Sequence, residues 1–293
     1  MLSALKEGAY QHGGYRTFVV TDSKRRVISA STFVDRLVNY ALCQRYIIPY
    51  TEPFLLPHTA ACRRRRGTSY ARRNLRQFIH QLSSHDKATC YVLRVDIRHF
   101  YDSIPHARLK QFIASAPYPE EVKGLCYQII ESYHASPGKG LPLGNQTSQW
   151  WANATLHSLD TLIVQQLGHR FYARYMDDLV LLHPDKQALQ VTRQHIIQHL
   201  WELGLAYHPR KTQLFPLKNG VEWLGWRYQL TANQGCYHVL PQRIKRRLRL
   251  KFKHQPLANE HVTTYRHYLQ TGKAYFFSKR YLPSSSRSFN EGL

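Results

Sequence analysis

Two adjacent aspartates, Asp177 and Asp178, lie in the stretch RYMDDLVLLHP, between aromatic and apolar residues. Neighbouring carboxylates repel each other, so a segment suited to burial needs a reason to hold both. A third aspartate, Asp96, lies near the end of the apolar run CYVLRVDI, 81 positions before Asp177 (177 − 96 = 81). Three converging carboxylates would suit Mg²⁺, which takes oxygen ligands, waters and substrate phosphates. Two such ions about 4 Å apart stabilise an in-line phosphoryl displacement. An ordinary turn with solvated charges is the alternative.

The elements that would bring these side chains together follow from the hydrophobic pattern. Residues 90–97 are rich in β-branched and aromatic side chains and predict a strand that ends at Asp96. Residues 171–175 and 179–183 predict two strands on either side of the aspartate pair. If the strand and the hairpin are neighbours in one sheet, all three carboxylates meet at its edge.

The rest of the chain alternates predicted helices and hairpins, so the expected fold class is α+β. Hairpins are predicted at residues 15–29 and within 221–240. Helical spacing is expected at residues 33–50, 69–82, 104–115, 148–167, 186–203 and 259–277, and in a basic helix that begins at Pro241.

The composition indicates a globular protein with a polyanionic partner. The 293 residues include 41 Lys and Arg against 18 Asp and Glu, a formal net charge of +23. A charge of this size repels itself in a compact chain, and nucleic acid is the usual partner that compensates it. No apolar run reaches the roughly 18 residues of a membrane span, so no membrane partner is expected. The five cysteines form no C-x-x-C pair, which fits a reducing, cytoplasmic location.

The sequence resembles the reverse transcriptases over nearly its whole length. Five segments carry the resemblance and occur in that family's order: RVDIRHFYDSI, GLPLGNQTSQWWAN, YMDD, HPRKTQLFP and VEWLGWRY. The resemblance implies an RNA-directed DNA polymerase that binds template RNA, the RNA–DNA hybrid and dNTPs. It also implies a right-hand polymerase fold. The expected fingers are residues 1–90, the palm residues 91–237 with part of the fingers inserted around 105–140, and the helical thumb residues 238–293.

The same resemblance implies roles around the active site. Asp96, Asp177 and Asp178, with the carbonyl group of Ile97, are expected to hold two Mg²⁺ ions. Lys211 is expected near the leaving pyrophosphate, as a fourth catalytic residue. The residues expected to contact the incoming nucleotide are Lys24, Arg25 and Arg26 at the triphosphate, Tyr101 as a barrier to a 2′-hydroxyl, and Leu143, Gly144 and Gln149. A solvated basic turn is the alternative for Lys24, Arg25 and Arg26, a surface lysine for Lys211, and core packing for Tyr101.

Three segments are expected to contact template and primer. They are the arginine run Arg63, Arg64, Arg65 and Arg66, the primer-grip residues Trp223, Leu224 and Gly225, and the basic helix with Arg243, Lys245, Arg246, Arg247 and Arg249. In that helix Ile244, Leu248 and Phe252 are spaced at i, i+4 and i+8, which predicts one apolar stripe. A membrane-surface helix or a solvated face is the alternative for the helix, and a solvated loop for the arginine run.

The loop at Leu143 indicates which type of reverse transcriptase the sequence resembles. Most reverse transcriptases carry a glutamine before this glycine, whereas this chain has Leu143-Gly144, followed by Ser148-Gln149. This pattern is similar to the bacterial or phage-encoded enzymes of diversity-generating retroelements, which copy a template RNA into error-containing cDNA. Those enzymes work with a small basic accessory protein. A retron-like or antiphage-defence reverse transcriptase is the alternative subtype. A template-independent nucleotidyl transferase and an inactive nucleic-acid-binding protein are alternatives from other classes.

Overall fold

The chain divides into two compact units. The structure is a computed structural model that describes residues 7–21, 25–83, 90–231 and 235–254, and six single residues: Val262, Thr263, Tyr265, Leu269, Ala274 and Leu282. The first unit comprises Met1–Leu75 and Tyr91–Leu214, and the second Arg76–Cys90 and Phe215–Leu293. One boundary therefore falls inside helix α4 (Thr68–Ser83) and another inside strand β6 (Gln213–Pro216).

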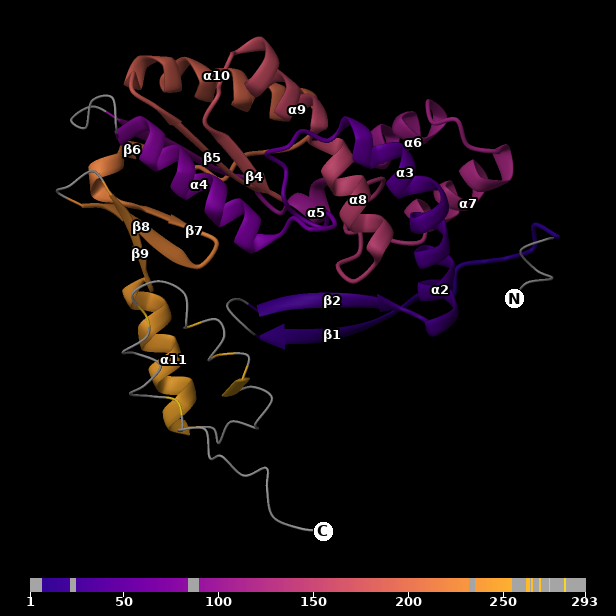
Figure 1. Ribbon diagram of the computed structural model, residues 1–293. Helices are drawn as coiled ribbons and strands as arrows, with labels where there is room; N and C mark the ends of the chain where they lie inside the picture. The colour runs from indigo at the N-terminus through magenta and orange to yellow at the C-terminus, as the bar shows by residue number, and fades with distance from the viewer. Residues whose placement is uncertain are drawn as a thin grey trace, which may run out of the picture. The chain divides into compact units, whose positions relative to one another are not determined.

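A four-stranded sheet lies mostly in the first unit (Figure 1). Its order is β4–β5–β3–β6, with β3 at Tyr91–Asp96, β4 at Tyr172–Tyr175 and β5 at Asp178–His183. Strand β5 runs antiparallel to both β3 and β4. Because side chains alternate between the faces of a strand, Val95 on β3 and Leu179 and Leu181 on β5 enter the same core. The sheet thereby connects the aspartate-bearing ends of its strands to a fully buried interior.

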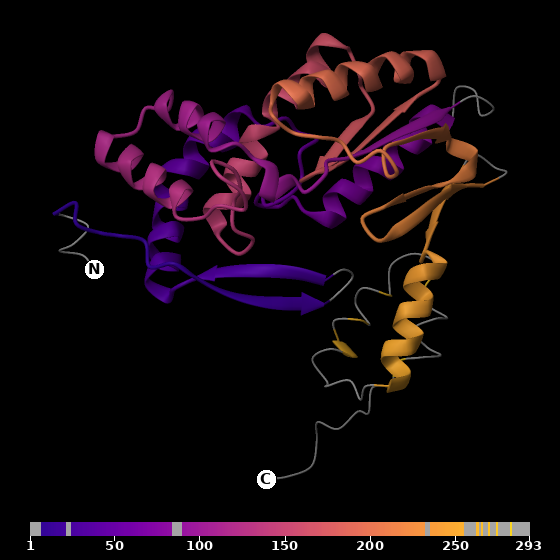
Figure 2. The same cartoon turned by 180° about the vertical axis from the view of Figure 1, so that it is seen from behind.

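Helix α10 (Lys186–Glu202) packs along β3 and β5, as the two opposite views show (Figures 1 and 2). It begins at Asp185, whose carboxylate accepts a hydrogen bond from the Gln187 N–H at 2.7 Å, a typical N-cap. A separate group of helices lies between β3 and β4 in the chain. They are α5 (Phe100–Ser103), α6 (His106–Ala114), α7 (Glu120–Glu131), α8 (Gln146–Thr155), α9 (His157–Thr161) and the π-helix η3 (Leu162–Gln166).

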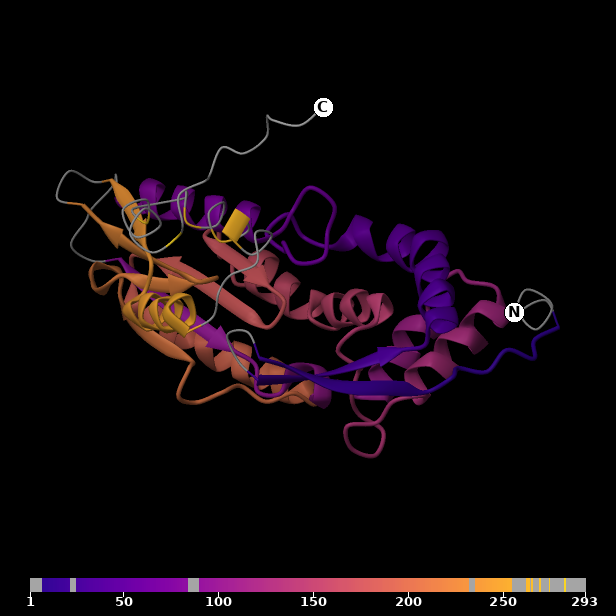
Figure 3. The ribbon, with the colours of Figure 1, turned by 90° about the horizontal axis from the view of Figure 1, so that it is seen from below.

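A two-stranded hairpin precedes these elements. Strands β1 (Tyr15–Thr21) and β2 (Arg25–Ser31) pair antiparallel and are largely exposed. The chain before β1 passes beside α7 (Figure 3), and the Tyr10 carbonyl accepts a hydrogen bond from the Gln128 amide at 2.9 Å. After β2 the chain enters a helical run made of α2 (Phe33–Leu42), the π-helix η1 (Cys43–Ile47), α3 (Ile48–Thr51) and the 3₁₀-helix η2 (Glu52–Phe54).

The second unit contains a three-stranded sheet and a basic helix. After the 3₁₀-helix η4 (Leu217–Asn219), strands β7 (Val221–Trp223), β8 (Trp226–Leu230) and β9 (Cys236–Val239) pair in sequence order. Leu224 and Gly225 join β7 to β8 with left-handed φ values of 47° and 85°, the geometry of a two-residue type I′ turn. In α11 (Gln242–His254) the predicted apolar stripe is confirmed, since Ile244 and Leu248 are buried.

Most elements predicted from the sequence are present, with informative differences. The strand and hairpin that carry the aspartates are neighbours, as predicted. The helix predicted at 148–167 is instead interrupted at Leu156 and continues as α9 and η3. Helix α7 has no counterpart among the predictions. The helix expected at 259–277 lies mostly outside the described residues. Among the described helices, none is both long enough and apolar enough to cross a membrane.

Candidate active site

Three aspartates meet where β3 ends and β5 begins. Asp96, the last residue of β3, lies directly opposite Asp178, the first residue of β5. Asp177 occupies the turn between β4 and β5, and its carbonyl oxygen accepts a hydrogen bond from the Ile97 N–H at 3.4 Å. One strand pairing and one tight turn therefore bring the three aspartates to the same edge of the sheet, and the role of all three as metal ligands stays a prediction.

Asp96 and Asp178 each have a cationic partner. Lys211 Nζ lies 2.9 Å from Asp96 Oδ1, and Arg94 Nε lies 3.3 Å from Asp178 Oδ1. Like charges directly opposite each other destabilise an antiparallel pair, and the two cations offset that repulsion. Burial raises the pKa of Asp178 to about 6, while Arg94 opposes the rise and the charges of Asp177 and Asp96 add to it.

Asp96 and Asp177 line a cleft of about 710 Å³. Cationic groups dominate the rest of its lining: Arg26, Arg98, Arg210 and Lys211, with His99 and His208. Two carboxylates surrounded by cations suit a polyphosphate bound beside a divalent metal ion. The sequence patterns did not single out Arg98, His208 or Arg210. Their position in the sequence could have indicated them, because Arg98 follows Asp96 by two residues and His208 and Arg210 lie within three residues of Lys211.

The donor set of this cleft fits Mg²⁺. Asp96 and Asp177 supply carboxylate oxygens, and Ile97 lines the same cleft. Among the described residues, no group of three Asp, Glu, His or Cys side chains forms a metal cage by itself. Mg²⁺ does not require such a cage, because it keeps several waters and takes substrate phosphates as ligands. Asp178 would join the ligands only by exchanging Arg94 for a metal ion.

The hairpin and α5 place two of the expected nucleotide contacts at or beside the cleft. Arg26 on β2 lines it, whereas Arg25 is exposed and Lys24 lies outside the described residues. Tyr101 on α5 lies beside the aspartate turn, with its hydroxyl 3.6 Å from Met176 Sδ. The ring also packs against the hydrophobic core, so its position suits a barrier to a 2′-hydroxyl and a packing role alike.

The loop before α8 is joined to the hairpin by backbone contacts. The Ser29 N–H on β2 donates to the Leu143 carbonyl at 2.9 Å. Gly144 has a φ of 139°, and a Cβ at this position would lie 2.9 Å from the Ser29 carbonyl oxygen. Only glycine tolerates both the backbone conformation and the close approach. Gln149, on the first turn of α8, is exposed.

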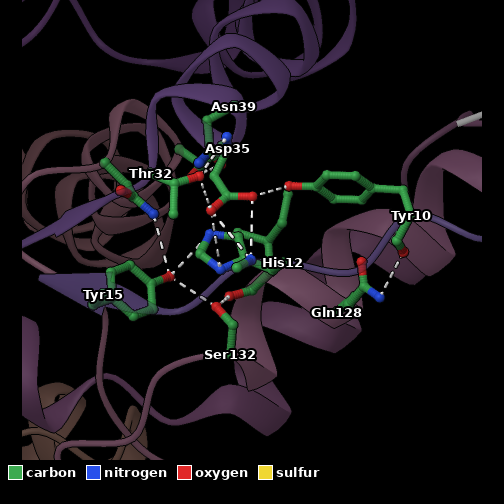
Figure 4. Close-up of polar contacts among 12 residues, drawn as sticks. Tyr10, His12, Tyr15, Thr32, Asp35, Asn39, Gln128 and Ser132 are labelled. Atoms are coloured by element: carbon green, nitrogen blue, oxygen red, sulfur yellow. Dashed lines mark hydrogen bonds and ion pairs between the residues drawn. The ribbon is translucent and has the colours of Figure 1, made fainter. Parts of the chain in front are cut away.

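A cluster centred on Asp35 fastens the base of the hairpin (Figure 4). The buried Asp35 carboxylate accepts hydrogen bonds from the hydroxyls of Tyr10 at 2.5 Å and Thr32 at 2.6 Å, and from the Gly13 N–H at 3.2 Å. Nearby, the Tyr15 hydroxyl lies 2.7 Å from Ser132 Oγ and accepts from the side-chain amide of Asn145 at 3.3 Å. The segment before β1, α2, α7 and the loop before α8 are therefore joined around one hydrogen-bonded centre.

The family model for reverse transcriptase (RNA-dependent DNA polymerase) matches residues 14–228. This range includes the three aspartates, the hairpin and the cleft. The chain belongs to the reverse transcriptase family. No curated protein sequence matches it.

Solved structures similar to this reverse transcriptase include two yeast telomerases. The apo telomerase of Candida tropicalis, truncated from its C-terminal domain, shares 14% identity at a TM-score of 0.52, over 77% of this chain and 56% of that one. The telomerase of Candida albicans in complex with a TWJ fragment of telomeric RNA shares 12% identity at a TM-score of 0.55, over 85% of this chain and 50% of that one. The reverse transcriptase thus spans about half of these chains. The likeness supports the expected right-hand polymerase fold.

The arginine run requires a correction. Arg63 is buried, with its guanidinium 2.8 Å from a carboxylate oxygen of Glu52 and bonded to the carbonyls of Leu56 and Thr59. The prediction that Arg63 contacts the template is therefore wrong, because its donors are used inside the protein. Arg66 donates to the Pro57 carbonyl at 2.7 Å. Arg64 and Arg65 are exposed and remain candidates for the template.

In the second unit, the expected primer and duplex contacts differ in exposure. Trp223 is fully buried, whereas Leu224 and Gly225, at the tip of the same hairpin, are partly exposed. A primer could therefore contact the two tip residues more easily than Trp223. On α11, Arg243 Nε lies 3.1 Å from Glu222. The remaining cations expected to face a duplex are exposed or partly exposed: Lys245, Arg246, Arg247 and Arg249.

Proposed function

We propose that this reverse transcriptase copies a template RNA into cDNA from dNTPs by nucleotidyl transfer with two Mg²⁺ ions. Bound metal ions would activate the primer 3′-hydroxyl and stabilise the leaving pyrophosphate. The observation that carries the proposal is the cleft that combines Asp96 and Asp177 with cations from three separate segments of the chain.

The acidic and the basic residues of the cleft have different proposed roles. Asp96, Asp177 and the Ile97 carbonyl supply oxygen ligands for metal ions. Arg26, from the hairpin side, would hold the triphosphate, with Arg98 and Arg210 as further cations that line the same cleft. Lys211, 2.9 Å from Asp96, would stabilise or protonate the leaving pyrophosphate.

The first experiment is primer extension on a defined RNA template with purified protein, dNTPs and Mg²⁺. We expect wild-type protein to extend the primer, and Asp177→Asn to lose extension while RNA binding persists, because one amide barely changes a net charge of +23. Glu121→Gln, an exposed change of the same kind on α7, is the matched control. Near-normal extension by Asp177→Asn would reject the metal site. Extension without a template would indicate a template-independent transferase.

We infer further that the enzyme is of the diversity-generating type and is error-prone. Leu143 lies in the loop joined to β2 and has no side-chain hydrogen-bonding group, where most relatives carry glutamine. A lost discriminating hydrogen bond is worth about 1 kcal/mol, or roughly a five- to tenfold change in error rate. A small basic accessory protein is part of this proposal.

Sequencing of cDNA made on a defined RNA tests the subtype. We expect frequent errors opposite template adenines with wild type and fewer with Leu143→Gln. The control is Leu37→Gln, which makes the same change at an exposed site on α2. Uniformly accurate copying by wild type would reject the diversity-generating subtype and favour a retron-like or antiphage-defence enzyme.

A further inference from the structure

Arg174, two residues before the turn residue Met176, does not line the cleft. Arg174 lies on β4 and is completely buried, as is its partner Asp160 on α9. A buried ion pair is weak evidence for stability, because desolvation of both charges costs about as much as their attraction returns. The presence of this pair therefore calls for an explanation beyond folding energy.

The guanidinium of Arg174 connects helices α8 and α9 with the turn that follows β4. Its Nε and Nη2 donate to the two oxygens of Asp160 at 2.7 and 2.6 Å. Its Nη1 donates to the side-chain oxygen of Asn153 on α8 at 3.1 Å and to the Met176 carbonyl, also at 3.1 Å. One rigid fork thus joins a buried acid, a buried amide and the backbone of the turn that carries Asp177.

Asp160 is held in turn by its own neighbours. The Tyr172 hydroxyl on β4 donates to Asp160 Oδ1, and the Thr59 hydroxyl donates to Asp160 Oδ2 at 3.1 Å. The acid is therefore fixed before it orients the arginine, and the position of the guanidinium is set from the protein interior.

The far end of the fork contacts a strained point of the backbone. Met176 has a φ of 54°, a left-handed conformation that is uncommon for a residue with a side chain. Its carbonyl belongs to the peptide that precedes Asp177, and the carbonyl of Asp177 itself accepts from the Ile97 N–H. The peptide groups on both sides of Asp177 are thus hydrogen-bonded, one of them by Arg174.

We infer that Arg174 is a positioning residue that holds the Met176–Asp177 peptide so that the Asp177 carboxylate faces the metal site. This inference rests on the proposed function, since it assigns Asp177 a metal ion to face. Arginine suits the role because its planar fork reaches Asp160 and Met176 at once, whereas a lysine ammonium keeps the charge but not that span.

The test compares two substitutions in the same buried network. Arg174→Lys keeps a cation for Asp160 and loses the bond to the Met176 carbonyl. Tyr172→Phe loses a bond to Asp160 and leaves the turn untouched. For each variant we would measure the thermal midpoint, RNA affinity, kcat and KM for dNTP, the Mg²⁺ concentration for half-maximal rate, and Mn²⁺ binding without substrate by electron paramagnetic resonance.

We expect both variants to lose thermal stability and to keep RNA affinity. Only Arg174→Lys should lower kcat, by roughly 10- to 100-fold for a displaced catalytic group. It should also weaken Mn²⁺ binding and raise the Mg²⁺ requirement. Equal kcat losses in the two variants, or unchanged Mn²⁺ binding in Arg174→Lys, would overturn the inference and leave Arg174 a structural residue.

If Arg174→Lys does not fold, the paired variant Asp160→Asn with Arg174→Gln removes both charges and retains polar groups at both sites. The same metal titration on that protein decides the question: unchanged Mn²⁺ affinity overturns the inference, and weakened affinity supports it. Failure of the proposed function is distinguishable. In that case wild type itself would not extend a primer, and Asp177→Asn would bind Mn²⁺ as wild type does.

Discussion

Asp160 and Asp35 are both buried carboxylates of the first unit, but their charges are satisfied in different ways. Asp160 faces the guanidinium of Arg174, so its centre holds two opposite charges. Asp35 accepts hydrogen bonds from Tyr10, Thr32 and Gly13, none of which is charged. The first centre lies behind the aspartate turn and the second at the base of the hairpin that carries Arg26.

The difference has a physical consequence for each centre. Burial alone would raise the pKa of Asp35, but the hydrogen bonds from Thr32, Tyr10 and Gly13 outweigh it and hold the pKa below its usual value. Burial alone would lower the pKa of Arg174, and the Asp160 charge outweighs it and raises that pKa. Asp160 therefore keeps its neighbour charged, whereas Asp35 organises neutral donors. Removing a charge should cost more at the first centre than at the second.

Asp160→Asn should have the largest effect, because it leaves Arg174 buried without a counter-charge. Breaking a buried pair from one side typically costs about 3–5 kcal/mol. Urea unfolding at pH 7.5 measures the loss against wild type. A loss below 1 kcal/mol would mean that Arg174 does not depend on Asp160, and the proposed contrast between the two centres would fail.

Asp35→Asn should cost less, about 1–3 kcal/mol, since it weakens hydrogen bonds without stranding an opposite charge. The same unfolding experiment applies. Because Asp35 fastens the base of the hairpin, we also expect KM for dNTP to rise more than kcat falls. A selective loss of kcat would instead place the effect at the aspartate turn.

Gly144→Ala tests the contact between the hairpin and the loop at a single point. The new Cβ would lie 2.9 Å from the Ser29 carbonyl oxygen, at a φ of 139°, and such strain costs of order 1–3 kcal/mol. We expect the hairpin to shift and KM for dNTP to increase. Gly124→Ala, on α7 with open space around the new Cβ, is the control. Equal KM values for the two variants would show that this contact does not position the nucleotide.

The sequence predicted the parts of this site that depend on local pattern. The β-branched run before Asp96 and the strands around Asp177 specify a sheet, and their convergence follows from strand pairing. The run Arg63 to Arg66 led to a wrong prediction for Arg63. Four successive arginines cannot be distinguished by sequence, and it is the fold that places Glu52 beside Arg63. Neither buried centre could be predicted as a whole, since several of its contacts join residues that are far apart in sequence. Thr59 and Asp160 are 101 positions apart, and Tyr15 and Asn145 are 130 apart.

The smallest expected effect is a change in how stability depends on pH, and it concerns His12. This histidine lies beside Asp35 and would carry a positive charge if it were protonated (Figure 4). Its Nδ1 lies 4.0 Å from Asp35 Oδ2. Burial lowers the pKa of His12, and the Asp35 charge only partly opposes that shift. The folded protein therefore keeps His12 neutral at a pH where the unfolded chain, with a pKa near 6.5, takes up a proton.

Stability should consequently fall as the pH drops below about 6.5, because the unfolded state then binds more protons. One group contributes at most about 1.4 kcal/mol per pH unit. We expect His12→Gln to lose less stability than wild type between pH 7.5 and 5.5, and the exposed control His195→Gln to behave as wild type. Asp35 does not complicate this comparison, because its pKa is lowered and its own loss of stability begins only near the pKa of an unfolded aspartate, about 3.9. The opposite result would be that acidification stabilises wild type relative to His12→Gln. Protonated His12 would then form an ion pair with Asp35, as Arg174 does with Asp160, and the two centres would be alike.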